Sequence, residues 1–258
     1  MKFIKSKNNS EYKNLKKLIS SSTAKKSSEF LVKGLKEIDL CFEHGFKPTK
    51  IYICSEIFDF EKRKIHIKAE LIDLSLTLFK NIFKNKHDGI IGLFKKKDFK
   101  LDNLNLPKNA FIVVLESPEK PGNIGAVFRT ADAAGVDAII ISNPKTEIYN
   151  PNLLRNSLGS FFSMQIGIAG NEEVLSFLQK KNIKIMSSLV KGDLNYHLAD
   201  YSGSIAIVIG PEESSLSNDW IAESADKIKI PMKGKMNSLN LSVSAAIVIF
   251  EASKQRKI

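Results

Sequence analysis

The sequence predicts an α/β protein in two parts, a small basic α/β module over residues 1–100 and a larger module with a mostly parallel sheet over residues 108–258. Segments with strand and helix patterns alternate along the chain, as in sheets covered by helices. Charge also divides the chain, because residues 1–100 carry 23 Lys and Arg against 12 Asp and Glu, and the remainder is neutral. Residues 95–109 are polar, charged and interrupted by Pro107, which is typical of a linker.

In the first module, short strands alternate with helices. Apolar residues at helical spacing between Tyr12 and Ile19 predict a helix within 10–28, ahead of the Ser- and Lys-rich run SSSTAKKSS. Alternating or apolar runs predict strands at 29–32, 50–54, 64–67 and 88–94, and helical spacing predicts helices at 35–42 and 73–85. These elements make up a small α/β module of about a hundred residues.

The second module opens with FIVVLE at 111–116, a continuous apolar run that predicts a parallel strand buried on both faces. A helix at 123–135 and a strand at 138–142 follow. Further strands are predicted at 162–169, 183–188, 204–210 and 226–231, and a closing helix at about 239–255. Ligands of such sheets lie at the carboxyl ends of the strands. The expected site therefore involves the loops 116–123, 143–151, 188–195, 210–217 and 231–238.

Composition excludes several classes of protein. With 43% hydrophobic residues the chain can form a core. No run approaches 18 apolar residues and the N-terminus has no apolar stretch of the secretory type, so we expect a cytoplasmic protein without a membrane span. Cys41 and Cys54 are too few for a disulfide framework or a four-thiolate zinc site, and the histidines show no ligand spacing, so no metal is expected. The basic excess favours a polyanionic partner, with RNA and DNA undistinguished.

The segment PGNIGAVFRTADAAG at 121–135 is the first of three with unusual composition. Asn123 is placed to cap the predicted helix, and Arg129 lies six residues further on, nearly two helical turns away. The alternative interpretation is a capped helix that carries a solvated arginine. Gly122 and Gly125 do not form G-x-G-x-x-G, which disfavours a nucleotide-dependent oxidoreductase.

The second and third segments follow predicted strands. In IVIGPEESSLS at 207–217, Glu212 emerges at a strand end, either as a helix cap or as a ligand contact. In IPMKGKMNSLNLSVSAAIVIFEASKQR at 230–256, Ser238 or Asn237 is the expected helix cap. Asn240 is expected within the first turn, where asparagine is a poor helix former and its amide better suits a hydroxyl or phosphate.

Together the three segments resemble the motifs of the SpoU-type RNA 2′-O-ribose methyltransferases of the SPOUT (trefoil-knot) superfamily. The first motif is similar to NIGAVFRTADAAG, the second to GPExxxLS and the third to IPMxGxxxSLNLSVS, in this order and at this spacing, within about 111–256. Residues 29–94 resemble, more loosely, the ribosomal-protein-L30e-like substrate-binding domain found ahead of many such enzymes. Lys33-Gly34 departs from that pattern, because an acidic residue before the glycine is commoner.

The resemblance implies an α/β trefoil-knot domain, in which segments between about 185 and 250 are tucked through one another, although general connection rules disfavour threaded chains. It implies a bound S-adenosylmethionine with backbone contacts from around Leu189, Gly210, Ile230 and Leu239. It also implies a homodimer with a site shared across the interface. Ser215 stands where the family usually has glycine, which predicts weaker cofactor binding.

By the same resemblance, Arg129 acts at the ribose 2′-hydroxyl or the adjacent phosphate. It could serve as a base or electrostatically; we favour the electrostatic role, because a guanidinium stays protonated. Asn123 and Asn240 would orient the ribose, Ser238 would hold the same network, and Glu212 would anchor one of its members. The expected substrate is ribosomal (23S) RNA, with transfer RNA as the alternative. A different alternative is a non-catalytic RNA-binding or ribosome-assembly protein, which would have little reason to keep the five residues together.

Overall fold

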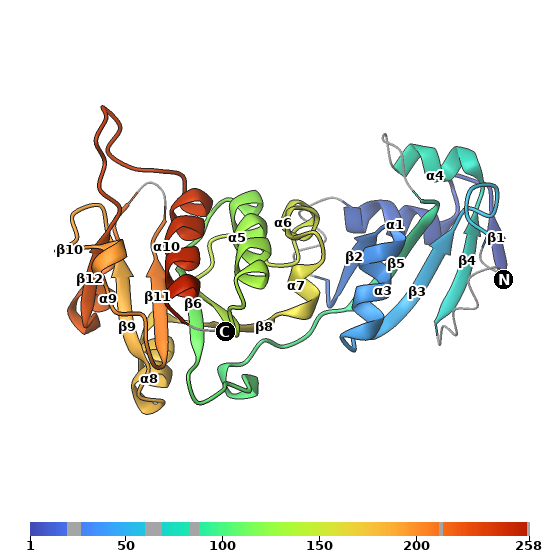
Figure 1. Cartoon of the computed structure of the whole chain (residues 1–258). Helices are drawn as coiled ribbons and strands as arrows, with labels where there is room; N and C mark the ends of the chain where they lie inside the picture. The colour runs from blue at the N-terminus through green and yellow to red at the C-terminus, as the bar shows by residue number, and fades with distance from the viewer. Residues whose placement is uncertain (20–26, 60–68, 83–87, 212–213, 257–258) are drawn as a thin grey trace. The chain divides into compact units, whose positions relative to one another are not determined.

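The computed structural model describes residues 1–19, 27–59, 69–82, 88–211 and 214–256 (Figure 1). Internal contacts divide the chain into a first unit, Met1–Lys97, and a second unit, Asp98–Ile258. Among the described helices, none is long and hydrophobic enough to cross a bilayer.

The first unit contains a mixed sheet with strand order β1-β4-β3-β5-β2. Pairing is parallel between β1 and β4 and between β4 and β3, and antiparallel where β5 meets β3 and β2. Its strands are β1 (Lys2–Ile4), β2 (Glu29–Lys33), β3 (Pro48–Ile53), β4 (Glu70–Leu74) and β5 (Ile90–Lys95). Its helices are α1 (Ser10–Ile19), α3 (Leu35–Glu43) and α4 (Leu76–Ile82).

Helices cover both faces of this sheet. Side chains alternate between the two faces of each strand, so each face buries its own set of residues. On one face, α1 and α4 pack Tyr12, Leu15 and Phe79 against a buried cluster that includes Leu31 and Leu93. On the other, α3 contacts β2 and β5. Cys41 on α3 and Cys54 after β3 are buried free thiols. They pack as ordinary small core residues.

The second unit is built on a sheet in which every strand pair is parallel. Its strand order is β10-β12-β9-β11-β6-β7-β8. The strands are β6 (Phe111–Glu116), β7 (Ala138–Ser142), β8 (Gln165–Ala169), β9 (Lys184–Ser188), β10 (Leu194–Asn195), β11 (Ile205–Ile209) and β12 (Asp226–Lys229). All residues of β6, β7 and β11 are buried, which confirms the expectation of strands covered on both faces.

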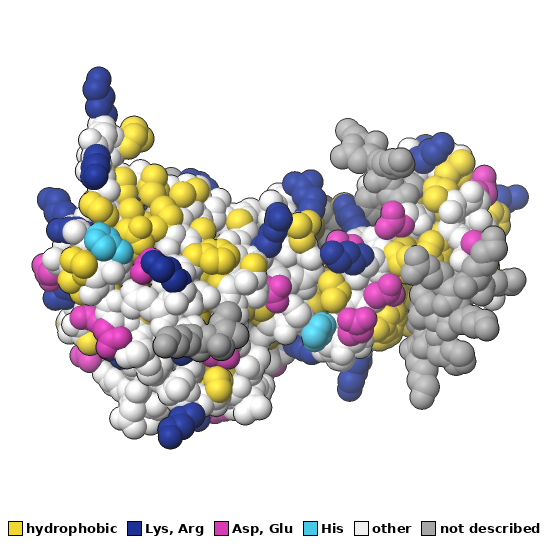
Figure 2. Space-filling view, in the orientation of Figure 1, with side chains coloured by type: hydrophobic (Ala, Val, Ile, Leu, Met, Phe, Trp, Pro, Cys, Tyr) yellow, Lys and Arg dark blue, Asp and Glu magenta, His cyan; other side chains and the backbone are white. Residues whose placement is uncertain are grey.

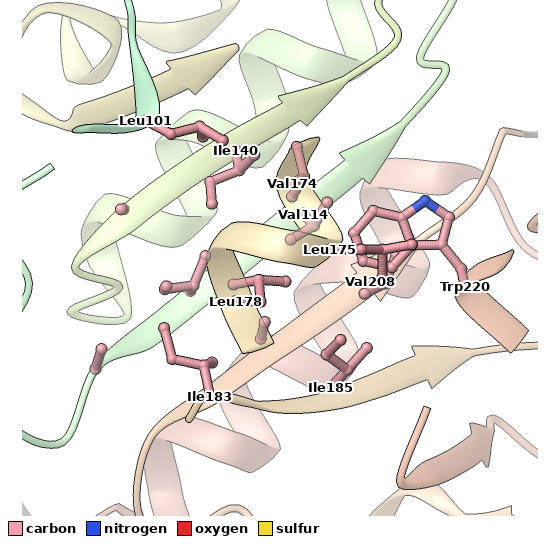
Figure 3. Close-up of a cluster of buried hydrophobic side chains, with 14 of the residues drawn as sticks. Leu101, Val114, Ile140, Val174, Leu175, Leu178, Ile183, Ile185, Val208 and Trp220 are labelled. Carbon is pink, nitrogen blue, oxygen red and sulfur yellow. The ribbon is translucent and has the colours of Figure 1, made fainter. Parts of the chain in front are cut away.

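The second unit's helices lie on both faces of its sheet (Figure 1). They are α5 (Pro121–Ala133), α6 (Pro151–Ser157), α7 (Ser160–Ser163), α8 (Asn171–Lys180), α9 (Asn218–Glu223) and α10 (Leu241–Gln255), with 3-10 turns η2 (Leu101–Asn103) and η3 (Tyr196–Leu198). On one face, α8 and Trp220 of α9 pack with Val114, Ile140 and Val208 in a buried cluster (Figure 3). Helix α10 packs on α5. The predicted class, α/β with a mostly parallel sheet, is confirmed.

The segment predicted as a linker is structured. The side chains of Leu101 and Leu104 are buried in the core of the second unit, and the Phe99 carbonyl accepts a hydrogen bond from the Ile168 N–H on β8. The ring of Phe99 also stacks on Tyr149. Most of 95–109 therefore covers the open edge of β8. The leucines within this otherwise polar segment supply the apolar surface that packs on the core.

The order of the sheet also makes one connection cross over a strand. Strand β12 is inserted between β9 and β10, which precede it and are joined only by residues 189–193. The Leu189 N–H donates to the Ile228 carbonyl and the Asp193 N–H to the Lys227 carbonyl, each at 2.8 Å. A Cβ on Gly192 would lie 2.6 Å from backbone atoms of Lys227 and Ile228. This crossing is the close tuck of C-terminal segments that the resemblance implies.

Some predicted elements differ from those found. The helix predicted at 73–85 begins later, since 70–74 form β4, and the strand predicted at 162–169 begins at Gln165, since α7 precedes it. Strands β1, β4 and β10 and helices α6, α7 and α8 were not predicted. The strand predicted at 64–67 lies outside the described residues.

Candidate active site

The carboxyl ends of β9, β11 and β12 surround a cavity of about 690 Å³. Three loops that the sequence singled out line it, namely those after residues 188, 209 and 229. Its wall combines apolar side chains with serine hydroxyls and the charged Lys191, Asp193 and Lys227. An apolar cleft with a few polar groups, at the carboxyl ends of parallel strands, is the usual form of a small-molecule site.

All four residues expected around the cofactor line this cavity. They are Leu189, Gly210, Ile230 and Leu239, and they come from three separate loops. The N–H of Leu189 already donates to Ile228, so only its carbonyl remains for a ligand. A Cβ on Gly210 would lie 3.1 Å from the Leu216 side chain, so a glycine lets the loop fold back on the strand end. Ser215, the departure from the family pattern, also lines the cavity.

The third motif forms one wall of the cavity through Ser238 and Leu239. Asn240 differs from expectation, because it is the N-cap of α10 and does not lie within the first turn. Its Oδ1 accepts hydrogen bonds from the N–H of Ser242 at 2.9 Å and from the Ser242 hydroxyl at 2.7 Å. The cap is therefore Asn240 and neither Asn237 nor Ser238. Both lone pairs of Oδ1 are therefore engaged at the start of the helix.

The first motif meets the third at the start of two helices. Asn123 is not the cap of α5, because the helix begins at Pro121 and Lys120 is the N-cap. Proline at the first helical position has no N–H to satisfy, which moves the start two residues earlier than expected. Asn123 lies in the first turn and lines a small hollow together with Leu241. Leu241 also lines the large cavity, so the hollow that contains Asn123 adjoins the cavity wall at this residue.

Helix α5 is held close to α6 by Gly125. A Cβ at this position would lie 2.4 Å from the Leu153 carbonyl oxygen and 2.9 Å from Cβ of Asn156. The two helix backbones therefore approach each other at a distance that only glycine permits. This contact fixes the orientation of α5 and of the residues it carries.

Arg129 is exposed on α5 and lines neither the cavity nor the hollow. Within the described parts of the chain its guanidinium has no hydrogen-bond or ion-pair partner. Arg256, by contrast, donates to the carbonyls of Tyr201 and Gly203 at 2.8 and 2.6 Å, and Arg155 contacts Asn152 on its own helix. The structure thus brings Ser238 to the cavity, places Asn123 and Asn240 beside it, and leaves Arg129 apart. Glu212 lies outside the described residues.

Sequence reasoning missed several lining residues and one buried carboxylate. Lys191 and Asp193 belong to a loop that was predicted to face the site but were not singled out. Glu116, at the end of β6, is 4% exposed and accepts hydrogen bonds from Asn171 and Ser217. The signal available in the sequence was the position of Glu116, an acidic residue at the end of a continuous apolar strand.

The cavity fits the group that the motifs imply. Leu189, Ile209 and Leu241 offer an apolar surface for a flat base, and Asp193 offers a carboxylate to hydroxyl, ammonium or sulfonium groups. The loop backbones at Gly210 and Ile230 supply polar groups without side-chain bulk.

Comparison with known proteins gives one family. Residues 110–250 match the model of the SpoU rRNA Methylase family. A 23S rRNA (uridine(2479)-2′-O)-methyltransferase of Streptomyces viridochromogenes is 26% identical over 243 residues, which cover 90% of this chain and 84% of that protein. A 23S rRNA (adenosine(1067)-2′-O)-methyltransferase of Streptomyces azureus is 32% identical over 201 residues, 76% of this chain and 73% of that one.

The same fold occurs in a solved structure. The SpoU methyltransferase AviRb from Streptomyces viridochromogenes, in complex with the cofactor AdoMet, superimposes with a TM-score of 0.88 at 24% identity. The superposition covers 96% of this chain and 98% of that one. The likeness therefore extends over both units and shows their folds.

Proposed function

Because the chain belongs to the SpoU rRNA methylase family, we infer that it is an enzyme that transfers a methyl group from S-adenosylmethionine to a ribose 2′-hydroxyl of RNA. One observation carries this function for the present chain. The cavity at the carboxyl ends of β9, β11 and β12 gathers residues of the second and third motifs, all within the matched region.

We propose that S-adenosylmethionine binds in this cavity, held by the loops that contain Leu189, Gly210, Ile230 and Leu239. When bound, it supplies an electrophilic methyl group. The protein supplies position, which for two well-oriented reactants lowers a barrier by as much as about 7–11 kcal/mol. The loops exclude water from one side of the site, because Leu241 and Ile209 form its apolar wall.

The remaining motif residues act on the ribose. Asn123 and Asn240 orient the sugar beside the cavity, and the Ser238 hydroxyl supports them from the cavity wall. Arg129 binds the adjacent phosphate with its planar fork and stabilises the alkoxide that develops on the 2′-oxygen. We assign Glu212 to anchoring this set, from its place in the second motif.

Ribosomal RNA is the favoured substrate, because the relatives compared above are named as 23S rRNA methyltransferases. We propose that the first unit binds this RNA. Its support is the charge of the chain, since the whole net excess of +11 falls within residues 1–100. We also propose a cytoplasmic location, because ribosomal RNA, the proposed substrate, is found there.

The test is to map ribose methylation by mass spectrometry. The purified protein is incubated with labelled S-adenosylmethionine and, separately, with unmodified ribosomal RNA and unmodified transfer RNA. We expect one new 2′-O-methyl group in ribosomal RNA. Methylation of transfer RNA alone would keep the chemistry and reject the substrate. Absence of both transfer and cofactor binding would favour a non-catalytic RNA-binding protein.

We further propose that the enzyme is a homodimer whose site is shared between two copies. Hydrophobic side chains gather on the outer face over α10 (Figure 2). Val243 and Phe250, seven residues apart on one side of α10, are 46% and 51% exposed, and Leu198 on the neighbouring η3 is 64% exposed. A soluble protein rarely leaves such a patch uncovered. The separation of Arg129 from its own cavity also supports a site completed by a second copy.

Phe250→Asp is expected to raise the dimer dissociation constant by about 100-fold, because it places a charge within this apolar patch. Analytical ultracentrifugation measures the change. Gln255→Asp is the control, since it adds the same residue at an exposed polar position of the same helix. A Phe250→Asp protein that sediments like the control would place the interface elsewhere.

A further inference from the structure

Glu116 carries a buried carboxylate that neither lines the cavity nor belongs to the proposed set of active residues. Burial of an ionised carboxylate is costly unless hydrogen bonds satisfy its oxygens. Here Oε1 accepts a hydrogen bond from Nδ2 of Asn171 at 2.8 Å, and Oε2 accepts one from the backbone N–H of Ser217 at 3.0 Å. Within the described residues it has no ion-pair partner. The carboxylate is therefore held by neutral donors alone.

Asn171 orients this arrangement from the start of α8. Its Oδ1 accepts a hydrogen bond from the hydroxyl of Ser142, which is fully buried at the end of β7. Its Nδ2 donates to Glu116 and also to the Ser217 hydroxyl at 3.2 Å. The network thus joins the ends of β6 and β7, the first residue of α8, and the residue before α9. Each member has a distinct donor or acceptor role.

The network fixes one end of the loop 210–217. At its other end this loop leaves the central strand β11, and Leu216 packs back against Gly210 and is itself buried. Between the two anchors, Pro211, Ser214 and Ser215 line the cavity. Because Glu116 holds Ser217 by its backbone, the position of this wall depends on the carboxylate.

We propose that Glu116 is a positioning residue, which with Asn171 sets the affinity for S-adenosylmethionine without touching the cofactor, by holding Ser217 and thereby the cavity wall formed by Ser214 and Ser215. This role rests on the proposed function, because it concerns the same cavity. In this network each hydrogen-bond donor faces an acceptor. A substitution that places two acceptors against each other should displace the cavity wall, and a second substitution that restores a donor should restore its position.

Asn171→Asp is the test, because it has nearly the same shape and places a second carboxylate against that of Glu116. We expect S-adenosylmethionine to bind about tenfold more weakly, as measured by calorimetry. The double variant Glu116→Gln/Asn171→Asp restores one donor facing one acceptor, and we expect its affinity to return to within about threefold of the wild type.

Asn105→Asp is the matched control, because it makes the same chemical change at an exposed side chain of the second unit. Melting curves establish that each variant is folded at the temperature of the titration, and Asn171→Ala replaces Asn171→Asp if the latter does not fold. A role in general stability would lower the melting temperature without the recovery of affinity in the double variant. The Michaelis constant for the cofactor is expected to rise, whereas that for RNA is not.

Unaltered affinity in the folded Asn171→Asp or Asn171→Ala protein would overturn the positioning role. Loss of affinity that persists in the double variant would overturn it as well, because the match would then not be the cause. Failure of the wild-type protein to bind S-adenosylmethionine would reject the proposed function itself, and the positioning role with it.

Discussion

Arg129→Ala is expected to slow methyl transfer by about 10²–10³-fold, the usual cost of removing a group that stabilises a developing oxyanion. Binding of S-adenosylmethionine is expected to be unchanged, since Arg129 does not line the cavity. The side chain is exposed, so the free energy of unfolding should change by no more than about 0.5 kcal/mol. Single-turnover methylation, calorimetry and denaturation measure these three quantities separately.

Arg129→Lys separates the two roles left open for this residue. Lysine keeps the positive charge but loses the planar fork, so an electrostatic and phosphate-binding role predicts a slower enzyme with an unshifted pH–rate profile. If the side chain acted as a base, lysine would give up its proton more readily, because its usual pKa of about 10.4 lies below that of arginine. The rate would then rise at lower pH. Full turnover by Arg129→Ala with cofactor bound would remove this residue from the mechanism.

The chain itself gives reason to expect an effect at this arginine. Of its 39 basic residues only four are arginine. Arg256 joins the end of α10 to backbone carbonyls, Arg155 contacts its own helix, and Arg63 lies outside the described residues. Arg129 is thus the arginine in the second unit for which the described structure provides no partner, and its planar fork suits a phosphate ligand.

Strands of the second unit could be predicted from the sequence where burial on both faces makes every residue apolar. The strand at 111–116 and the strand at 138–142 were predicted at the residues where they occur. β10 could not be predicted, because two residues are extended only through pairing with Ile228 and Lys229. β4 was hidden by Asp73, whose buried carboxylate accepts hydrogen bonds from the N–H and hydroxyl of Ser55. Such partners are distant in sequence and leave no local signal.

The site was predictable to the level of its loops. Strand order brings loop ends together, so a rule about carboxyl ends locates the cavity without knowledge of contacts. Which residue within a loop takes a given role depends on geometry. Ser238 and Asn240 are both good helix caps, and the structure uses Asn240 because its oxygen reaches the N–H of Ser242. Glu116 was missed because its partners are 55 and 101 residues away along the chain.

Gly192→Ala is expected to lower the free energy of unfolding by about 2–4 kcal/mol, through overpacking and the loss of backbone hydrogen bonds. A Cβ at this position would lie 2.6 Å from the carbonyl carbon and oxygen of Ile228 and from the Lys227 oxygen. These are backbone atoms of β12, in the interior of a parallel sheet, and they cannot rotate away as a side chain would. The connection 189–193 must then lift from β12 and break the hydrogen bonds of Leu189 and Asp193.

The same displacement predicts a loss of function that can be measured while the protein is still folded. Leu189, Lys191 and Asp193 line the cavity from this connection, so S-adenosylmethionine should bind at least about tenfold more weakly. Trp220 is the only tryptophan and lies in the core, so its fluorescence reports unfolding. Gly170→Ala is the control, because its Cβ would meet only Asn143 at 3.6 Å, and the replacement of glycine by alanine at the N-cap of α8 should cost about 0.5–1 kcal/mol. Equal stability of the two variants would mean that the crossing over β12 is loose, and the threaded arrangement would then not be what shapes the cavity.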